Sequence, residues 1–279
     1  MRKAKDSNTC LFSKMNKFLV IAMLAIMAAS CGEPATNSTA SNTQKKTGGN
    51  GDRGNEIIAE FLKRDAAPLR KTRVRFNITS EDGVKVYEID VWRKQAGDET
   101  STLTQIIKPE EDSDLASLTV ETKDKPANVT SYSTTLKDFR ETDTNKMFFG
   151  GITAGELLGE WHKFDFRLVK EEGGQFQLEG KLKKGESGTV ARSEVTMSSD
   201  NYVPKQLKLY DSSDKLIRTF DITDTKTDDH GAYASKTTVD NPIYKTKTEI
   251  EILSREFPAT VDPTFFTKDK LKAIASRSK

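Results

Sequence analysis

The stretch "VTMSSDNYVPKQLKLYDSSDKLIRTFDIT", from Val195 to Thr223, contains the pattern that decides the fold. Apolar and polar residues alternate in each of its three apolar segments, and the turn sequences "SSDNYVP" and "DSSDK" separate these segments. A period of two is typical of a strand with one buried face, and Asp, Asn, Ser and Pro are typical of tight turns. The stretch therefore predicts three successive antiparallel strands.

The same alternation continues on both sides of this stretch. It predicts further strands at residues 74–79, 84–92, 101–108, 115–122, 128–136, 162–169, 175–182 and 244–253. The apolar residues Val84 and Val86 are out of phase with Tyr87 and Ile89, which suggests a β-bulge. Helical spacing appears only near residues 55–67, 152–160 and 264–275, so the chain is mainly β, with a curved antiparallel sheet or barrel and few helices.

The N-terminal region has the order of a secretory signal peptide. Basic residues precede the apolar run Phe18–Ala29, which is too short to span a bilayer, and "AASC" follows it. This ending resembles the lipobox of bacterial lipoproteins, in which the cysteine, here Cys31, becomes lipidated. An ordinary signal peptide with an incidental cysteine is the alternative. We therefore expect a signal peptide at 1–30, a lipidated Cys31 with a flexible tether at 31–54, and a single folded domain at 55–279.

The charge balance excludes one broad class of partners. The chain has 44 Lys and Arg against 42 Asp and Glu, a net charge of +2, and no basic stripe is evident. Nucleic-acid binding needs a concentrated positive field, so nucleic acid is not expected as a partner.

A curved sheet with few helices tends to enclose apolar space on its covered face. The residues expected to line such a cavity are the inward apolar positions of successive strands: Phe164, Phe166, Phe176, Leu178, Leu207, Leu209, Phe220 and Ile222. A solid core without a cavity fits the same pattern equally well. Phe148, Phe149 and Trp161 flank a glycine-rich helix and are interpreted either as core residues or as a lid.

Catalytic and metal-binding motifs are missing from the sequence. The two histidines are His162, predicted on a strand beside Phe164, and His230 in the turn "TDDHG". Neither belongs to a zinc, calcium-loop, nucleophile-elbow or Walker motif. We expect no enzyme activity, no metal and no cofactor.

Three stretches carry a resemblance to a known family. "KMFFGGITAGELLGEW", "VTMSSDNYVPKQLKLYDSSDKLIRTFDITD" and "NPIYKTKTEIEIL", with "DPTFFTKDKL" near the end, resemble the LolA/LolB-like outer membrane lipoprotein-sorting proteins. The resemblance covers roughly residues 55–271. It implies an incomplete antiparallel β-barrel, or half-barrel, whose concave side is plugged by helices and which binds acyl chains of lipoproteins or other lipids.

Three functions remain open at this point. One is a lipid-anchored acyl-chain carrier or acceptor in lipoprotein sorting or lipid transport. Another is an RseB-like envelope sensor that binds a partner protein and transports nothing. The third is a purely structural surface lipoprotein. Because Gly32, and not an Asp, follows Cys31, we expect attachment to the outer membrane through lipidated Cys31, facing the periplasm.

Cys31→Ser should release the protein from the membrane fraction of a bacterial host. A single acyl chain binds membranes only marginally, whereas the chains on a lipoprotein cysteine together anchor it stably. Fractionation with radiolabelled palmitate checks this expectation. Equal palmitate incorporation into wild type and variant would contradict it.

Overall fold

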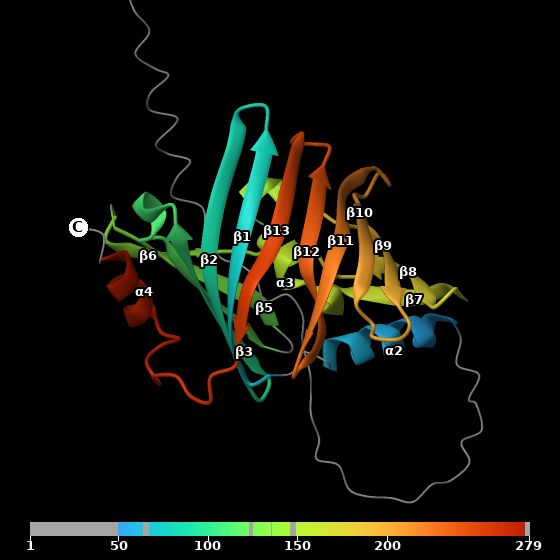
Figure 1. Ribbon diagram of the computed structural model, residues 1–279, viewed down its shortest axis with the longest axis horizontal. Helices are drawn as coiled ribbons and strands as arrows, with labels where there is room; N and C mark the ends of the chain where they lie inside the picture. The colour runs from blue at the N-terminus through green and yellow to red at the C-terminus, as the bar shows by residue number, and fades with distance from the viewer. Residues whose placement is uncertain (1–49, 64–66, 123–124, 135, 146–148, 277–279) are drawn as a thin grey trace, which may run out of the picture.

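The protein folds around one antiparallel sheet of 13 strands (Figure 1). The computed structural model describes residues 50–63, 67–122, 125–134, 136–145 and 149–276. The strands follow the order β6-β5-β4-β3-β2-β1-β13-β12-β11-β10-β9-β8-β7 across the sheet. Their bounds are β1 (Leu69–Ser80), β2 (Gly83–Ala96), β3 (Glu99–Lys108), β4 (Ala116–Thr122), β5 (Lys125–Ser133), β6 (Asp138–Thr142), β7 (Phe164–Glu172), β8 (Gln175–Leu182), β9 (Arg192–Ser198), β10 (Pro204–Tyr210), β11 (Leu216–Asp228), β12 (Gly231–Asn241) and β13 (Thr246–Glu256).

The sheet is curved and does not close into a barrel. In the strand order, β6 and β7 form its two edges, while β1 pairs with β13 and so joins the first hairpin to the last. The predicted fold class, mainly β with an open antiparallel half-barrel, is confirmed.

The alternation in the sequence determines which residues face the concave side. Val74, Phe76 and Ile78 of β1 are buried in one cluster with Phe149, Ile152 and Leu157 of the segment between β6 and β7. Their polar neighbours on the strand, such as Arg75, lie on the other face and form ion pairs there. The largest hydrophobic cluster thus lies between the centre of the sheet and this connecting segment.

The connecting segment contains the short helix α3 (Ala154–Leu158), flanked by the 3₁₀ turns η3 (Phe149–Gly151) and η4 (Trp161–Lys163). Thr153 caps α3: its hydroxyl accepts a hydrogen bond from the Glu156 amide, and the Glu156 carboxylate accepts one from the Thr153 amide. Figure 1 shows α3 behind the central strands, on the concave side.

Helix α2 (Asn50–Lys63) covers the β7 end of the sheet. Its apolar residues Ile57, Ile58 and Phe61 pack with Phe166 and neighbouring side chains of β7 to β9. At Gly54 the helix approaches β7 so closely that a Cβ atom would lie 2.4 Å from the carbonyl oxygen of Phe166.

Helix α4 (Lys268–Ala275) lies on the opposite face from α2 and α3. It packs against Leu103 and Leu118. Leu103 stands opposite Trp92, and the adjacent Val91 belongs to the concave cluster. Because neighbouring side chains on a strand point to opposite faces, α4 covers the outer face. Helices α2 and α3 plug the concave side, and α4 does not.

Several local expectations need correction. The β1–β2 register runs unbroken from Leu69 to Ser80, so there is no bulge at Val84 and Val86, whose side chains are exposed on the outer face. Strand β6 was not predicted. The three helices begin at Asn50, Ala154 and Lys268, not at 55, 152 and 264. Residues 50–54, assigned to the tether, form the first turn of α2. Cys31, the signal peptide and the rest of the tether lie outside the described residues.

Gly54→Ala should destabilise the protein, although alanine ordinarily stabilises a helix. The new Cβ would collide with the backbone of β7, so we expect a loss of roughly 2 kcal/mol in the free energy of unfolding. Urea denaturation checks this, with the exposed Glu56→Ala on the same helix as control. A stabilised Gly54→Ala variant would contradict the close packing of α2 on β7.

Candidate functional site

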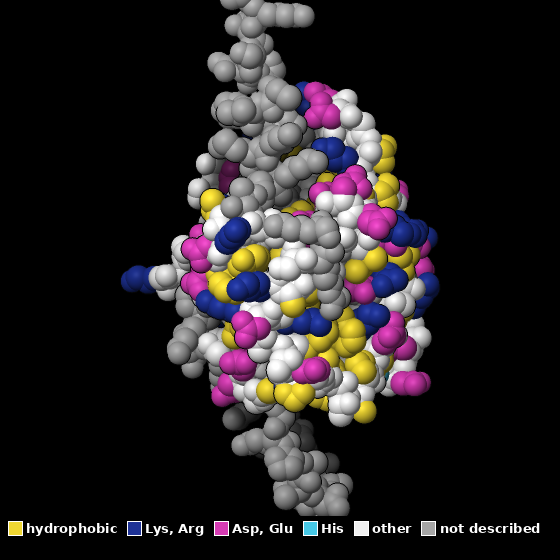
Figure 2. Space-filling view, turned by 90° about the vertical axis from the view of Figure 1, so that its left-hand side faces the viewer, with side chains coloured by type: hydrophobic (Ala, Val, Ile, Leu, Met, Phe, Trp, Pro, Cys, Tyr) yellow, Lys and Arg dark blue, Asp and Glu magenta, His cyan; other side chains and the backbone are white. Residues whose placement is uncertain are grey.

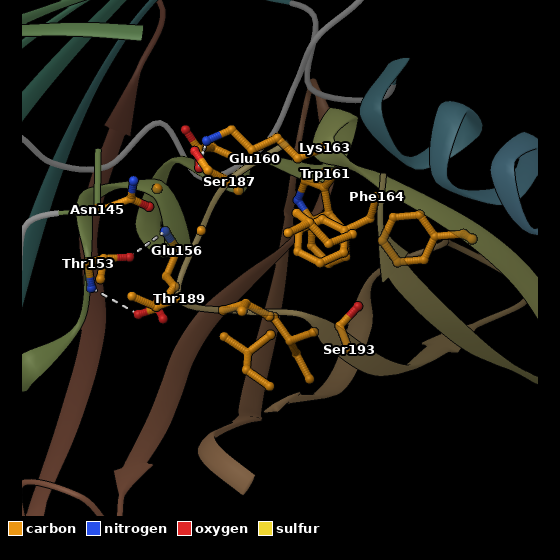
Figure 3. Close-up of a pocket in the computed structure, with 18 residues that line it drawn as sticks. Asn145, Thr153, Glu156, Glu160, Trp161, Lys163, Phe164, Ser187, Thr189 and Ser193 are labelled. Carbon is orange, nitrogen blue, oxygen red and sulfur yellow. Dashed lines mark hydrogen bonds and ion pairs between the residues drawn. The ribbon is translucent and has the colours of Figure 1, made fainter. Parts of the chain in front are cut away.

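The concave side holds an apolar pocket between η4, α3 and strands β7 to β10 (Figure 3). About 600 Å³ of space lies within it, part of which is open to solvent. Its apolar lining consists of Trp161, Phe164, Phe166, Leu182, Val190, Leu207 and Leu209. Glu160, Lys163 and the segment Ser187–Thr189 add polar groups to this wall. The pocket is therefore a largely hydrophobic space with a few polar groups.

A second pocket adjoins the first one. It also holds about 600 Å³ including open solvent, and it extends along the sheet to β11, β12 and β13 through Phe220, Ile222 and Ile250. Both pockets are lined by Glu156, Gly159, Trp161 and Leu207. The shared residues make the two pockets neighbouring parts of one apolar trough, with Trp161 and Leu207 between them.

The residues expected to line a cavity fall into four groups. Phe164, Phe166 and Leu209 line the first pocket, Phe220 and Ile222 line the second, and Leu207 lines both. Phe176 and Leu178 line neither, because α2 covers them. That any of these side chains contacts a ligand stays a prediction.

Trp161 lies where the two pockets meet, a position that the sequence did not predict. It lines both pockets and packs edge-on against Phe61 of α2, with ring centroids 5.7 Å apart. Phe149, in contrast, is a core residue that stacks against Phe76 and Tyr87 at 5.4 and 4.4 Å. Phe148 lies outside the described residues.

A buried arginine fixes the segment that covers the trough. The Arg218 guanidinium on β11 donates to the Gly151 carbonyl oxygen and forms an ion pair with Glu156, Nη1 to Oε1, at 2.8 Å. Asn241 and Thr246 donate to the Gly150 carbonyl. Gly150 and Gly151 have φ of 62° and 74°, a conformation that side chains disfavour, and this allows their carbonyls to meet these donors.

Burial of Glu156 disfavours the ionised form of its carboxyl group. Burial raises the pKa of its carboxyl, while the Arg218 charge and the hydrogen bonds with Thr153 oppose that rise. The Glu156 carboxylate thus lines both pockets, but it is already paired with Arg218 and accepts a hydrogen bond from the Thr153 amide.

Glu121 on β4 is a second titratable group near the trough. Burial raises the pKa of its carboxyl to about 7. The charges of Arg93 and Lys163 lower this pKa, and that of Glu160 raises it. Lys163 is itself paired with Glu160, Nζ to Oε2, at 2.7 Å, and both line the first pocket. Glu121 therefore lies within electrostatic range of the rim of the trough.

The histidines do not assemble with other reactive groups. His162 lies exposed in η4, and not on the strand that was predicted for it. His230 stacks on Phe257, with ring centroids 3.7 Å apart. Within the described ranges, no group of three or more His, Cys, Asp or Glu side chains is placed to hold a metal ion. None of the helices in the described part of the chain has the length and apolar character to cross a bilayer.

The fold is shared with several solved structures. A DUF1329 family protein from Desulfovibrio piger has a TM-score of 0.73 and 15% identity, covering 79% of this chain and 98% of its own. A putative outer membrane lipoprotein-sorting protein domain from Vibrio parahaemolyticus has a TM-score of 0.69 and 18% identity, covering 80% and 99%. A LolA superfamily protein from Nitrosomonas europaea has a TM-score of 0.63 and 13% identity, covering 78% and 98%.

Sequence comparison gives a family match as well. The model of a family described only as "-like: Uncharacterized protein" matches residues 98–273, more than half of the chain. No curated protein matches the chain.

The stability of the protein should depend on pH through Glu121. Its pKa is about 7 in the folded protein against an ordinary value of 4.5, so the folded state holds this proton more tightly than the unfolded chain. The stabilisation is complete below about pH 4.5 and is lost as pH rises through about 7, amounting to roughly 3 kcal/mol.

Glu121→Gln removes this titration. Relative to wild type, the variant should gain stability between about pH 5 and pH 8, measured by urea denaturation at each pH. An identical pH dependence of the two proteins would show that Glu121 does not titrate in this range.

Proposed function

We propose that this chain, which has the fold of a LolA superfamily protein and of a putative outer membrane lipoprotein-sorting protein domain, is a lipid-anchored, non-catalytic protein of the bacterial envelope that shelters an acyl chain in the trough. The observation that carries this proposal is the pair of adjoining apolar pockets along β7 to β13. Small-molecule sites typically have mostly apolar walls with a few polar groups, and both pockets have this character.

The chemistry of the walls suits a chain of methylene groups. Phe164, Phe166 and Leu209 offer aromatic and branched surfaces without charge. Burying each methylene contributes about 0.8 kcal/mol, but a chain taken from a bilayer is already buried. The trough would therefore bind acyl chains reversibly, as a carrier or an acceptor of lipids must.

The ligand would be an acyl chain of a lipoprotein or of another lipid. One of the solved structures that share the fold is a putative outer membrane lipoprotein-sorting protein domain, and this supports a role in lipoprotein sorting for this chain. Lipidated Cys31 would attach the protein to the outer membrane, and the tether would let the domain face the periplasm. No nucleic acid is proposed: on the face in Figure 2, basic and acidic side chains are intermixed.

An envelope sensor that binds a partner protein is the second candidate. The observation in its favour is a set of exposed apolar side chains near the ends of two adjacent hairpins: Val84 and Val86 on β2, and Ile243 and Tyr244 between β12 and β13. The ion pair Lys245–Glu81, at 2.9 Å, joins these hairpins. Exposed apolar side chains can mark a protein-binding surface. A sensor of this kind does not require a hollow trough, so a measurement of fatty-acid binding distinguishes the two candidate functions.

Leu207→Trp should block the trough, because Leu207 lines both pockets and a larger apolar side chain would fill the space where they meet. We expect binding of a fluorescent fatty acid to weaken by at least about tenfold. Leu216→Trp, the same change at an exposed position, is the matched control.

Titration by fluorescence, with circular dichroism to confirm folding, decides the outcome. A folded wild-type protein that binds no fatty acid would refute the carrier function and favour the sensor. Equal affinities of wild type and Leu207→Trp would place the ligand outside the trough.

A further inference from the structure

Trp161 and Leu207 stand at the place where the trough is divided into its two pockets. Both residues line both pockets (Figure 3). Trp161 comes from η4 on the covering side, and Leu207 comes from β10 of the sheet. Leu207 also packs against both hydrophobic clusters, the one at the centre of the sheet and the one under α2. An acyl chain that ran from one pocket into the other would have to pass between these two side chains.

The trough opens to solvent at its first pocket. The segment Ser187–Thr189 in the wall of this pocket is exposed. Of the described residues that line the second pocket, none is exposed, and its one charged side chain, Glu156, is paired with Arg218. The polar end of an acyl ligand is therefore best accommodated at Ser187–Thr189, and the methyl end of its chain points toward Trp161.

The indole of Trp161 is positioned by packing and not by a hydrogen bond. Its ring contacts those of Phe61 and Phe166, each at a centroid distance of 5.7 Å. The indole also lies against Gly159, where a Cβ atom would be 2.6 Å from Nε1. Nε1 is buried without a hydrogen-bond partner among the described residues, although a buried tryptophan usually has one. A phenylalanine would join this cluster without an unsatisfied donor, so the cluster alone does not require an indole.

We propose that Trp161 sets the length of the acyl chain that the trough accepts, because its large ring stops the chain at the inner end of the first pocket. This inference rests on the proposed function and adds the residue that determines the specificity of the same site. Each methylene that becomes buried strengthens binding roughly fourfold. Methylenes beyond those that reach Trp161 do not enter the second pocket, so they add nothing to the affinity.

A series of straight-chain fatty acids, from octanoic to hexadecanoic acid, tests this proposal by displacement of a fluorescent fatty acid. With the wild-type protein, the affinity should rise with chain length and then level off within the series. In Trp161→Ala the second pocket becomes accessible, so the rise should continue to longer acids. We expect the ratio of the affinities for hexadecanoic and octanoic acid to increase at least about tenfold, which corresponds to roughly two more buried methylenes.

Three further variants separate the length effect from a loss of folding, which circular dichroism monitors. Trp161→Phe keeps an aromatic ring in the cluster and should give a smaller increase of the same ratio. Adding Ile222→Trp to Trp161→Ala fills the second pocket again and should return the ratio to that of the wild type. Phe176→Leu changes an aromatic residue of the same cluster that lines neither pocket, and it should leave the ratio unchanged.

The wild-type length profile alone can overturn the proposal. An affinity that keeps rising through hexadecanoic acid would show that the chain already passes Trp161. Equal changes for every acid in Trp161→Ala and Trp161→Phe would make the ring an ordinary part of the wall, and this also overturns the proposal. If the wild type binds none of the acids, the proposed function itself fails. If it binds them with a length profile that does not depend on Trp161, only the present inference fails.

Discussion

The arrangement of the concave side depends on the buried guanidinium of Arg218. It joins β11 to the α3 segment through the Gly151 carbonyl and the Glu156 carboxylate. Removing one partner of a buried ion pair typically costs 3–5 kcal/mol, because the other charge remains without compensation. The α3 segment is short, and its capping box satisfies only its own first turn. Its position over the sheet is therefore set by Arg218, together with Asn241 and Thr246, and this position defines a wall of both pockets.

An open sheet makes this wall necessary. A closed barrel would pack its interior with strand side chains alone, but here β6 and β7 are separate edges, and the curved face between them needs other cover. Helix α2 covers the end at β7, and the α3 segment covers the centre. Helix α4 lies on the outer face and contributes nothing to this cover. Space therefore remains between α2 and α3, where Trp161 and Leu207 lie.

Much of the fold follows from residue alternation, because a period of two fixes both the strand and its buried face. The stretch from Val195 to Thr223 formed β9, β10 and the start of β11, as the pattern predicted. Strand β6 escaped prediction because "DFRET" is short and has little alternation. The face that α4 covers could not be predicted, because an amphipathic helix reveals its apolar side and not its partner. For Arg218 a signal existed: it has the phase of Phe220 and Ile222, so alternation places it inward.

Native mass spectrometry would reveal whether the trough holds an acyl lipid. Cys31→Ser protein, purified without detergent from a bacterial envelope fraction, would be analysed intact and after solvent extraction. We expect a non-covalently bound acyl lipid, and we expect it to be absent when Leu207→Trp is added and the protein is prepared in the same way. If the Cys31→Ser protein, whose trough is unaltered, carries no lipid and takes none up from phospholipid vesicles, the trough is not a lipid-binding site.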